Sequence, residues 1–202
     1  MQDENAPPTV NKLTPVILLT LALWLAYALT IGGSGFFYYV PPPMIGMFIW
    51  TPLVLLLAAY RLSPAFREWV FGIDWRALLM LHLTRFVGIY FLILHERGRL
   101  PYAFAVLGGW GDIAAAIGAL LVAAWCAPPA TKLRWRLFWL WNLLGLLDII
   151  FVMLTALRLN LTNREAMLEL TKLPLSLLPT FIVPLIIVSH IFMFLRLSKQ
   201  KK

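Results

Sequence analysis

The sequence predicts an all-α protein, a polytopic membrane helical bundle of six transmembrane helices with both termini in the cytoplasm. Hydrophobic residues make up 61% of the 202 residues and charged residues only 13%, a composition that excludes an ordinary soluble domain. The chain also divides into six apolar stretches, and a helical span needs about 20 mostly apolar residues to cross the bilayer. Little sequence remains for a soluble domain, so we expect a single transmembrane domain over residues 1–202.

The expected spans are separated by charged, proline-bearing or short polar segments. The first span follows an acidic segment, 1–12, that lacks the basic start of a secretory signal peptide, so we expect this span to be retained. Two connecting segments, 63–76 and 162–172, mix apolar side chains with charges, as short helices at a membrane surface do. The spans are expected at residues 13–31, 44–60, 76–94, 102–126, 135–157 and 173–197.

Basic residues are divided unequally between the two ends of these spans. With a cytoplasmic N-terminus, eleven Lys and Arg residues fall on the cytoplasmic side and five on the other, as cytoplasmic loops retain positive charge. We therefore expect this orientation, in a bacterial inner membrane. The asymmetry also explains the formal net charge of +8 without nucleic acid, and we expect the basic tail, 196–202, to meet anionic lipid headgroups. A belt of tryptophans is expected near one interface: Trp125, Trp135, Trp139 and Trp141.

Three charged residues fall in the middle of expected spans. At about 1.5 Å of rise per residue, Arg85, Asp112 and Asp148 all lie in the central layer of a hydrocarbon core about 30 Å thick. Because each charge alone would be costly there, we expect the arginine to pair with both carboxylates across helices. Asn142, with Thr84, Thr155 and Ser189, is expected to add hydrogen bonds. This centre either clamps three helices together or lines a cavity that binds or moves a small solute or a proton.

Two places in the spans predict backbone irregularity. The segment 108–112, GGWGD, holds three glycines immediately before an aspartate, and each glycine costs about 1 kcal/mol relative to alanine in a helix. We expect a local break or bulge there. In the sixth span Pro184 lacks an N–H and displaces the carbonyl of Thr180, so this acceptor must find another partner within the membrane.

His82 and His190 are the remaining ionisable residues inside spans. Each is six residues from a basic residue at the cytoplasmic end, Arg76 or Arg196, and so lies about 9 Å inside the same leaflet. Matched depth is what two axial ligands of a transmembrane b-type haem need, so a haem-binding redox protein is an alternative function. His95 falls at the opposite end, which disfavours a three-histidine zinc site. A structural or assembly partner without a ligand is a further alternative.

Catalytic signatures are absent from the sequence, which has no GxSxG, HExxH, CxxC, Walker loop or dinucleotide fingerprint. Nothing therefore requires an enzyme, and no cofactor other than haem is indicated. The single cysteine, Cys126, excludes an intramolecular disulfide and a cysteine-only metal site. A homo-oligomer remains open.

The run RFVGIYFL, which begins at Arg85, is followed by LPYAFAVLGGWGD, which ends at Asp112. Together the two runs resemble a pattern of small uncharacterised bacterial six-helix integral membrane proteins. The resemblance covers residues 85–112 and implies no activity. It implies that the arginine and the aspartate belong to one structural unit.

Overall fold

The computed structural model describes residues 13–200, and within them every regular element is a helix and there are no strands. Six helical segments are long and apolar enough to cross a membrane, which confirms the predicted fold class. The acidic segment 1–12 and the last two lysines of the basic tail lie outside the described residues. The six membrane-crossing segments are Leu13–Gly33, Pro42–Leu62, Trp75–Glu96, Tyr102–Trp125, Lys132–Thr162 and Leu178–Lys199.

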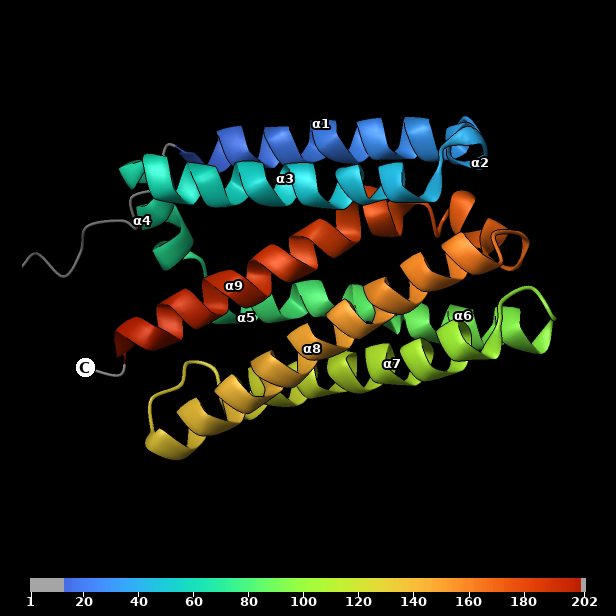
Figure 1. Ribbon diagram of the computed structural model, residues 1–202. Coiled ribbons are helices and arrows are strands. Elements are labelled where there is room, and N and C mark those ends of the chain that lie inside the picture. The colour runs from blue at the N-terminus through green and yellow to red at the C-terminus, as the bar shows by residue number, and fades with distance from the viewer. Residues whose placement is uncertain (1–12, 201–202) are drawn as a thin grey trace, which may run out of the picture.

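The elements follow one another along the chain with short connections. In order they are α1 (Leu13–Gly33), α2 (Phe36–Tyr39), α3 (Pro42–Leu62), α4 (Pro64–Gly72), α5 (Trp75–Met80), η1 (Leu81–Phe86), α6 (Val87–Glu96), α7 (Tyr102–Trp125), α8 (Lys132–Thr162), η2 (Glu165–Thr171), η3 (Leu178–Ile182) and α9 (Val183–Gln200). The start of α1 and the end of α9 lie at the same end of the bundle (Figure 1), as an even number of spans requires. Which end faces the cytoplasm stays a prediction from the basic residues.

The helices pack in a chain of neighbours rather than around one central helix. α7 contacts α5, η1 and α6 on one side and α8 on the other, and α9 packs between α8 and α3. Figure 1 shows α1 and α3 on one side of the bundle, with α9 lying between them and the layer of α5 to α8. The arrangement brings the third, fourth, fifth and sixth spans together, and these are the spans that carry the ionisable residues.

A departure from α-helix lies in the third span, and not where the glycines predicted it. α7 continues without interruption through 108–112, so the expected break or bulge is wrong. The glycines instead allow close packing, because a Cβ at Gly109 would lie 2.9 Å from the carbonyl oxygen of Gly88 on the neighbouring helix. The third span changes from α-helix to a 3-10 helix over Leu81–Phe86, the six residues that include His82 and Arg85.

The sixth span begins with a π-helical turn at Leu178–Ile182, so its helix starts five residues later than expected at 173. The displaced carbonyl does find a partner, because Nε1 of Trp24 donates to the carbonyl oxygen of Thr180 at 2.8 Å. The indole also packs edge-on against Phe181, with ring centroids 4.9 Å apart. The prediction made from Pro184 is therefore confirmed, and the bond ties α1 to η3 at the start of the sixth span.

Replacing Trp24 with phenylalanine should lower the free energy of unfolding by about 1 kcal/mol, because it leaves the Thr180 carbonyl without its donor inside the membrane. Phenylalanine retains an aromatic ring against Phe181. Trp110→Phe, at an exposed tryptophan of α7, is the matched control. Thermal unfolding in detergent micelles measures both, and equal melting temperatures for the two variants would contradict the proposed role of this bond.

The two connecting segments expected at the membrane surface are short helices. Ser63 caps α4, its hydroxyl oxygen accepting from the Phe66 amide at 3.2 Å. At the opposite end of the bundle, Glu169 of η2 accepts hydrogen bonds from Arg99 at 2.5 Å and Lys172 at 2.7 Å. Partial burial would raise the pKa of Glu169, but the two basic partners outweigh it and hold that pKa below its usual value. The contact fastens η2 to the α6–α7 connection.

Candidate functional site

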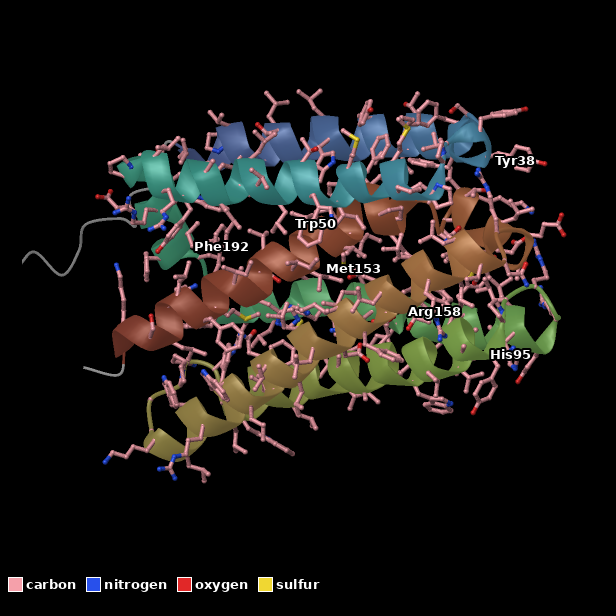
Figure 2. The ribbon with its side chains drawn as sticks, in the orientation of Figure 1. Tyr38, Trp50, His95, Met153, Arg158 and Phe192 are labelled. Atoms are coloured by element: carbon pink, nitrogen blue, oxygen red, sulfur yellow. The ribbon has the colours of Figure 1, made fainter. Side chains whose placement is uncertain are left out.

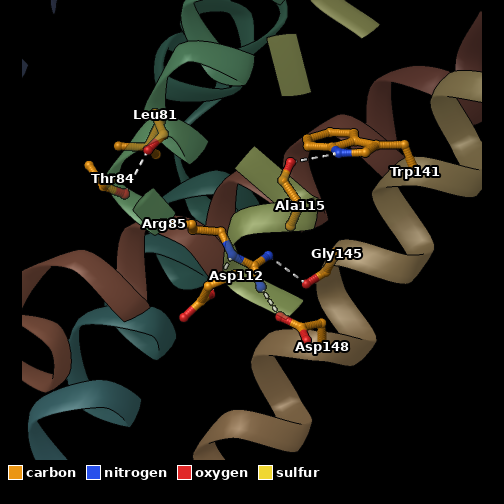
Figure 3. Close-up of polar contacts among 8 residues, drawn as sticks. All are labelled: Leu81, Thr84, Arg85, Asp112, Ala115, Trp141, Gly145 and Asp148. Atoms are coloured by element: carbon orange, nitrogen blue, oxygen red, sulfur yellow. Dashed lines mark hydrogen bonds and ion pairs between the residues drawn. The ribbon is translucent and has the colours of Figure 1, made fainter. Parts of the chain in front are cut away.

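The Arg85 guanidinium lies at the centre of the bundle, 1% exposed, and is held by two carboxylates and a carbonyl. Nε donates to Oδ1 of Asp112 at 2.7 Å, and Nη2 donates to Oδ2 of Asp148. Nη1 donates to the carbonyl oxygen of Gly145 at 2.9 Å. Figure 3 shows these partners arriving from α7 and α8 around the arginine. The pairing predicted from depth alone is therefore confirmed.

Glycines let the three helices approach closely enough for these contacts. The backbones of α6 and α7 touch at Gly88 and Gly109, three residues after Arg85 and three residues before Asp112. A Cβ at Gly111 would overlap the carboxylate of Asp148. The glycine-rich segment before the aspartate thus sets the register of the ion pairs on both sides of α7.

The two carboxylates have different surroundings. Asp112 is buried and receives its hydrogen bond at Oδ1, and no described residue donates to its Oδ2, which Figure 3 shows turned away from the guanidinium. The side chain of Asp148 is 21% exposed. With all three groups ionised, the centre carries one positive and two negative charges, a net charge of −1.

A cavity of about 200 Å³ reaches Arg85 and Asp112. It lies among α3, the η1–α6 segment, α7, α8 and the η3–α9 segment, and most of its lining is apolar. Its polar lining residues are Thr84, Arg85, Asp112, Asn160 and Thr171. Asp148 does not line the cavity, so Arg85 separates a carboxylate that reaches the cavity from one that does not.

The sequence predicted that Asn142 would add hydrogen bonds to the charged centre, but its amide instead bonds His190. Its Nδ2 donates to the backbone carbonyl of His190 at 3.0 Å, and its Oδ1 lies 2.8 Å from Nδ1 of the imidazole. Because the amide oxygen only accepts, Nδ1 carries the proton in this contact. Nε2 of His190 is then the unprotonated nitrogen of the neutral imidazole, and it is buried without a partner among the described residues.

His82 has the same kind of arrangement. Its Nε2 lies 3.1 Å from the hydroxyl of Ser189, and this hydroxyl donates to the carbonyl oxygen of Ile186 at 2.8 Å. Nε2 therefore donates to the serine oxygen, and Nδ1 is the bare nitrogen, again buried without a partner in the part of the chain described. The two rings lie in contact, with centroids 4.4 Å apart.

This contact does not fit a bis-histidine haem. The macrocycle would have to pass between the two imidazoles, and rings already in contact leave no space for it. One nitrogen of each ring is also engaged, by Ser189 and by Asn142. Within residues 13–200 no group of three or more His, Cys, Asp or Glu side chains is placed to hold a metal ion. The matched depth of His82 and His190 reflects their packing against each other.

Trp141 belongs to this cluster, which sequence reasoning missed by assigning it to an interfacial belt. It is buried, its Nε1 donates to the carbonyl oxygen of Ala115 at 3.1 Å, and its ring centroid lies 5.1 Å from that of His82. A signal was present in the spacing, because Trp141, Gly145 and Asp148 lie four and three residues apart and so share one helix face. Trp125 and Trp139 are exposed, as expected.

A family described as a domain of unknown function (DUF8737) matches residues 42–198. No curated protein and no solved structure matches the chain. The matched range contains the arginine, both aspartates and the histidine pair, and it begins after α1.

Proposed function

We propose that this chain, which belongs to the family described as a domain of unknown function (DUF8737), binds a small solute or a proton at the charged centre and moves it across the membrane. The observation that carries the proposal is that one guanidinium holds two carboxylates from two different spans. Ionisable residues inside a membrane are functional candidates by default, because they are costly to keep there. The chain is a multi-span membrane protein by helix length and composition.

The net charge of the centre supports the proposal that it binds a proton. A centre that carries one excess negative charge in a low-dielectric interior is stabilised by taking up one proton or one cation. Asp112 reaches the cavity and Asp148 is partly exposed elsewhere, yet both are bonded to Arg85. A ligand that binds beside one carboxylate therefore changes the environment of the other through the shared guanidinium. This is the linkage that a proton-coupled carrier needs.

The second candidate is a structural clamp, in which the same charges only fix three helices together. The close glycine contacts on both sides of α7 favour the clamp, because they hold the helices together whether or not a ligand binds. The clamp and the proton site differ in one respect. A clamp stays in a single protonation state over the pH range in which the protein is folded.

Infrared difference spectroscopy of the purified protein in lipid nanodiscs tests the proposal. As the pH is lowered, we expect a buried carboxylic acid C=O band equivalent to one proton per chain, because one proton neutralises the net charge of −1. The double variant Asp112→Asn with Asp148→Asn should lose this band. Glu169→Gln, which removes a carboxylate outside the membrane spans, should retain it. A wild-type band that survives in the double variant, or no titrating band at all, would refute proton binding here.

A further inference from the structure

The cavity beside the charged centre is open to the side of the bundle. Among its lining residues, Trp50 of α3 is 55% exposed and Leu154 of α8 is 61% exposed. Both lie within membrane-crossing helices, Trp50 near the middle of its helix and Leu154 eight residues before the end of its own, so the surface they expose faces the bilayer. Figure 2 labels two of the lining residues, Trp50 on α3 and Met153 on α8. A ligand can therefore reach the cavity from within the membrane.

The walls select for apolar character. The lining from α3 and α9 includes Ile45, Ile49, Val183 and Ile186, and a molecule must shed its hydration before it lies against these side chains. A cavity of about 150 Å³ lined by Leu, Ile and Phe is known to bind benzene. The volume of about 200 Å³ found here suits a single ring, or an aliphatic group of similar size, with one small polar substituent.

The charged residues of the lining favour a positively charged ligand. Three of the five N–H donors of Arg85 already point to Asp112, Asp148 and Gly145, whereas Oδ2 of Asp112 receives no hydrogen bond from the described residues. Asp112 lines the cavity and has a free acceptor oxygen, and Arg85 keeps two N–H donors, in a centre that has a net charge of −1 when all three groups are ionised. An ammonium group supplies both a donor and the missing positive charge.

We propose that the solute is a lipophilic monocation, a small aromatic or aliphatic amine in its ammonium form, which enters from the bilayer between α3 and α8 and places its ammonium group against Asp112. This inference rests on the proposed function and names its substrate class. Because the ammonium group and a proton neutralise the same excess charge, the two compete. Binding of the amine therefore releases the proton from the centre.

Benzylamine is the probe, and benzyl alcohol is its neutral control of nearly the same shape. Both are titrated into wild-type protein in nanodiscs by calorimetry, with empty nanodiscs subtracted. We expect benzylamine to bind about tenfold or more tightly than benzyl alcohol, the ratio given by one charge-assisted hydrogen bond. Benzylamine should bind more weakly as the pH is lowered, because protons then occupy the centre, and the alcohol should not respond to pH.

Three variants make the test specific. Asp112→Asn should remove the preference for the amine, and Gly46→Leu should weaken binding of both probes by filling the cavity. Gly46 is suited to this change because a Cβ there meets only Trp50, at 3.7 Å. Glu169→Gln, outside the cavity, should bind both probes as the wild type does.

Equal affinity for benzylamine and benzyl alcohol would overturn the proposal that the solute is a cation. Binding of either probe that Gly46→Leu leaves unchanged would overturn the lateral cavity as its location. In both cases a titrating band in the infrared experiment would still support proton binding at the centre, so the two proposals can fail independently. If the Asp112 variant does not fold, the comparison of the two probes and the Gly46 variant decide the question alone.

Discussion

Arg85→Leu is expected to lower the free energy of unfolding on the order of 3 to 5 kcal/mol, or to prevent folding, because it leaves two carboxylates without their buried counter-charge. It also leaves the Gly145 carbonyl without its donor. Thermal or denaturant unfolding in detergent measures the loss. Arg158→Leu, at an exposed arginine of α8, serves as the control and should change stability by about 0.5 kcal/mol or less.

A triple variant separates the loss of the arginine from the charges it leaves behind. Arg85→Leu combined with Asp112→Asn and Asp148→Asn removes all three charges, and should recover most of the stability that the single variant loses. If the proposed function is right, the recovered protein folds but shows no titrating carboxylic acid and no preference for benzylamine. Strictly additive losses across the single, double and triple variants would mean that the three groups do not interact, against the geometry described above.

Gly88→Ala is expected to cost about 3 kcal/mol, at the upper end of overpacking effects, because its Cβ would overlap the carbonyl oxygen of Gly109. The obstacle is backbone, so no side-chain rotation relieves it, and α6 must move away from α7. That movement also separates Arg85 from Asp112, one turn away on each helix. The measurement is again unfolding in detergent.

Gly46→Ala is the matched control for this substitution. It lies in a membrane-crossing helix too, but a Cβ there is 3.7 Å from the nearest side-chain atom, an ordinary contact. We expect it to be neutral or stabilising by up to about 1 kcal/mol, the helix propensity gained. If both alanine variants behave alike, the α6–α7 contact at Gly88 and Gly109 is not as close as described.

The charged centre was predictable because depth along a span follows from the sequence. A helix rises by a fixed amount per residue, so Arg85, Asp112 and Asp148 are placed in the same layer by counting, and the cost of an unpaired charge in hydrocarbon then requires them to meet. The same kind of argument predicted that the Thr180 carbonyl would have a hydrogen-bond partner outside its own helix. A proline removes a bond and the membrane requires another, although the sequence does not indicate that Trp24 supplies it.

The rotation of each helix about its own axis, which decides where its side chains point, was not predictable in this way. Asn142 lies three residues before Gly145 and six before Asp148, yet it bonds His190, because the rotation of α8 points its amide toward α9. The equal depth of His82 and His190 was compatible both with haem ligation and with direct contact of the rings. In the structure the two rings are in direct contact. The position of Trp141 in the sequence predicted a place at the membrane interface, but the rotation of α8 turns its side chain into the bundle, where it is buried.

By itself, the sequence determined that this is a membrane bundle of six apolar helices and that one arginine and two aspartates meet at its centre, since the bilayer acts on every span through length, hydropathy and depth. The tertiary structure alone decided where the backbone departs from α-helix, which side chains join the histidines and where the cavity opens. These features depend on rotation about each helix axis and on the fit between neighbouring helices. Side chains from several spans set both, so no single stretch of sequence contains them.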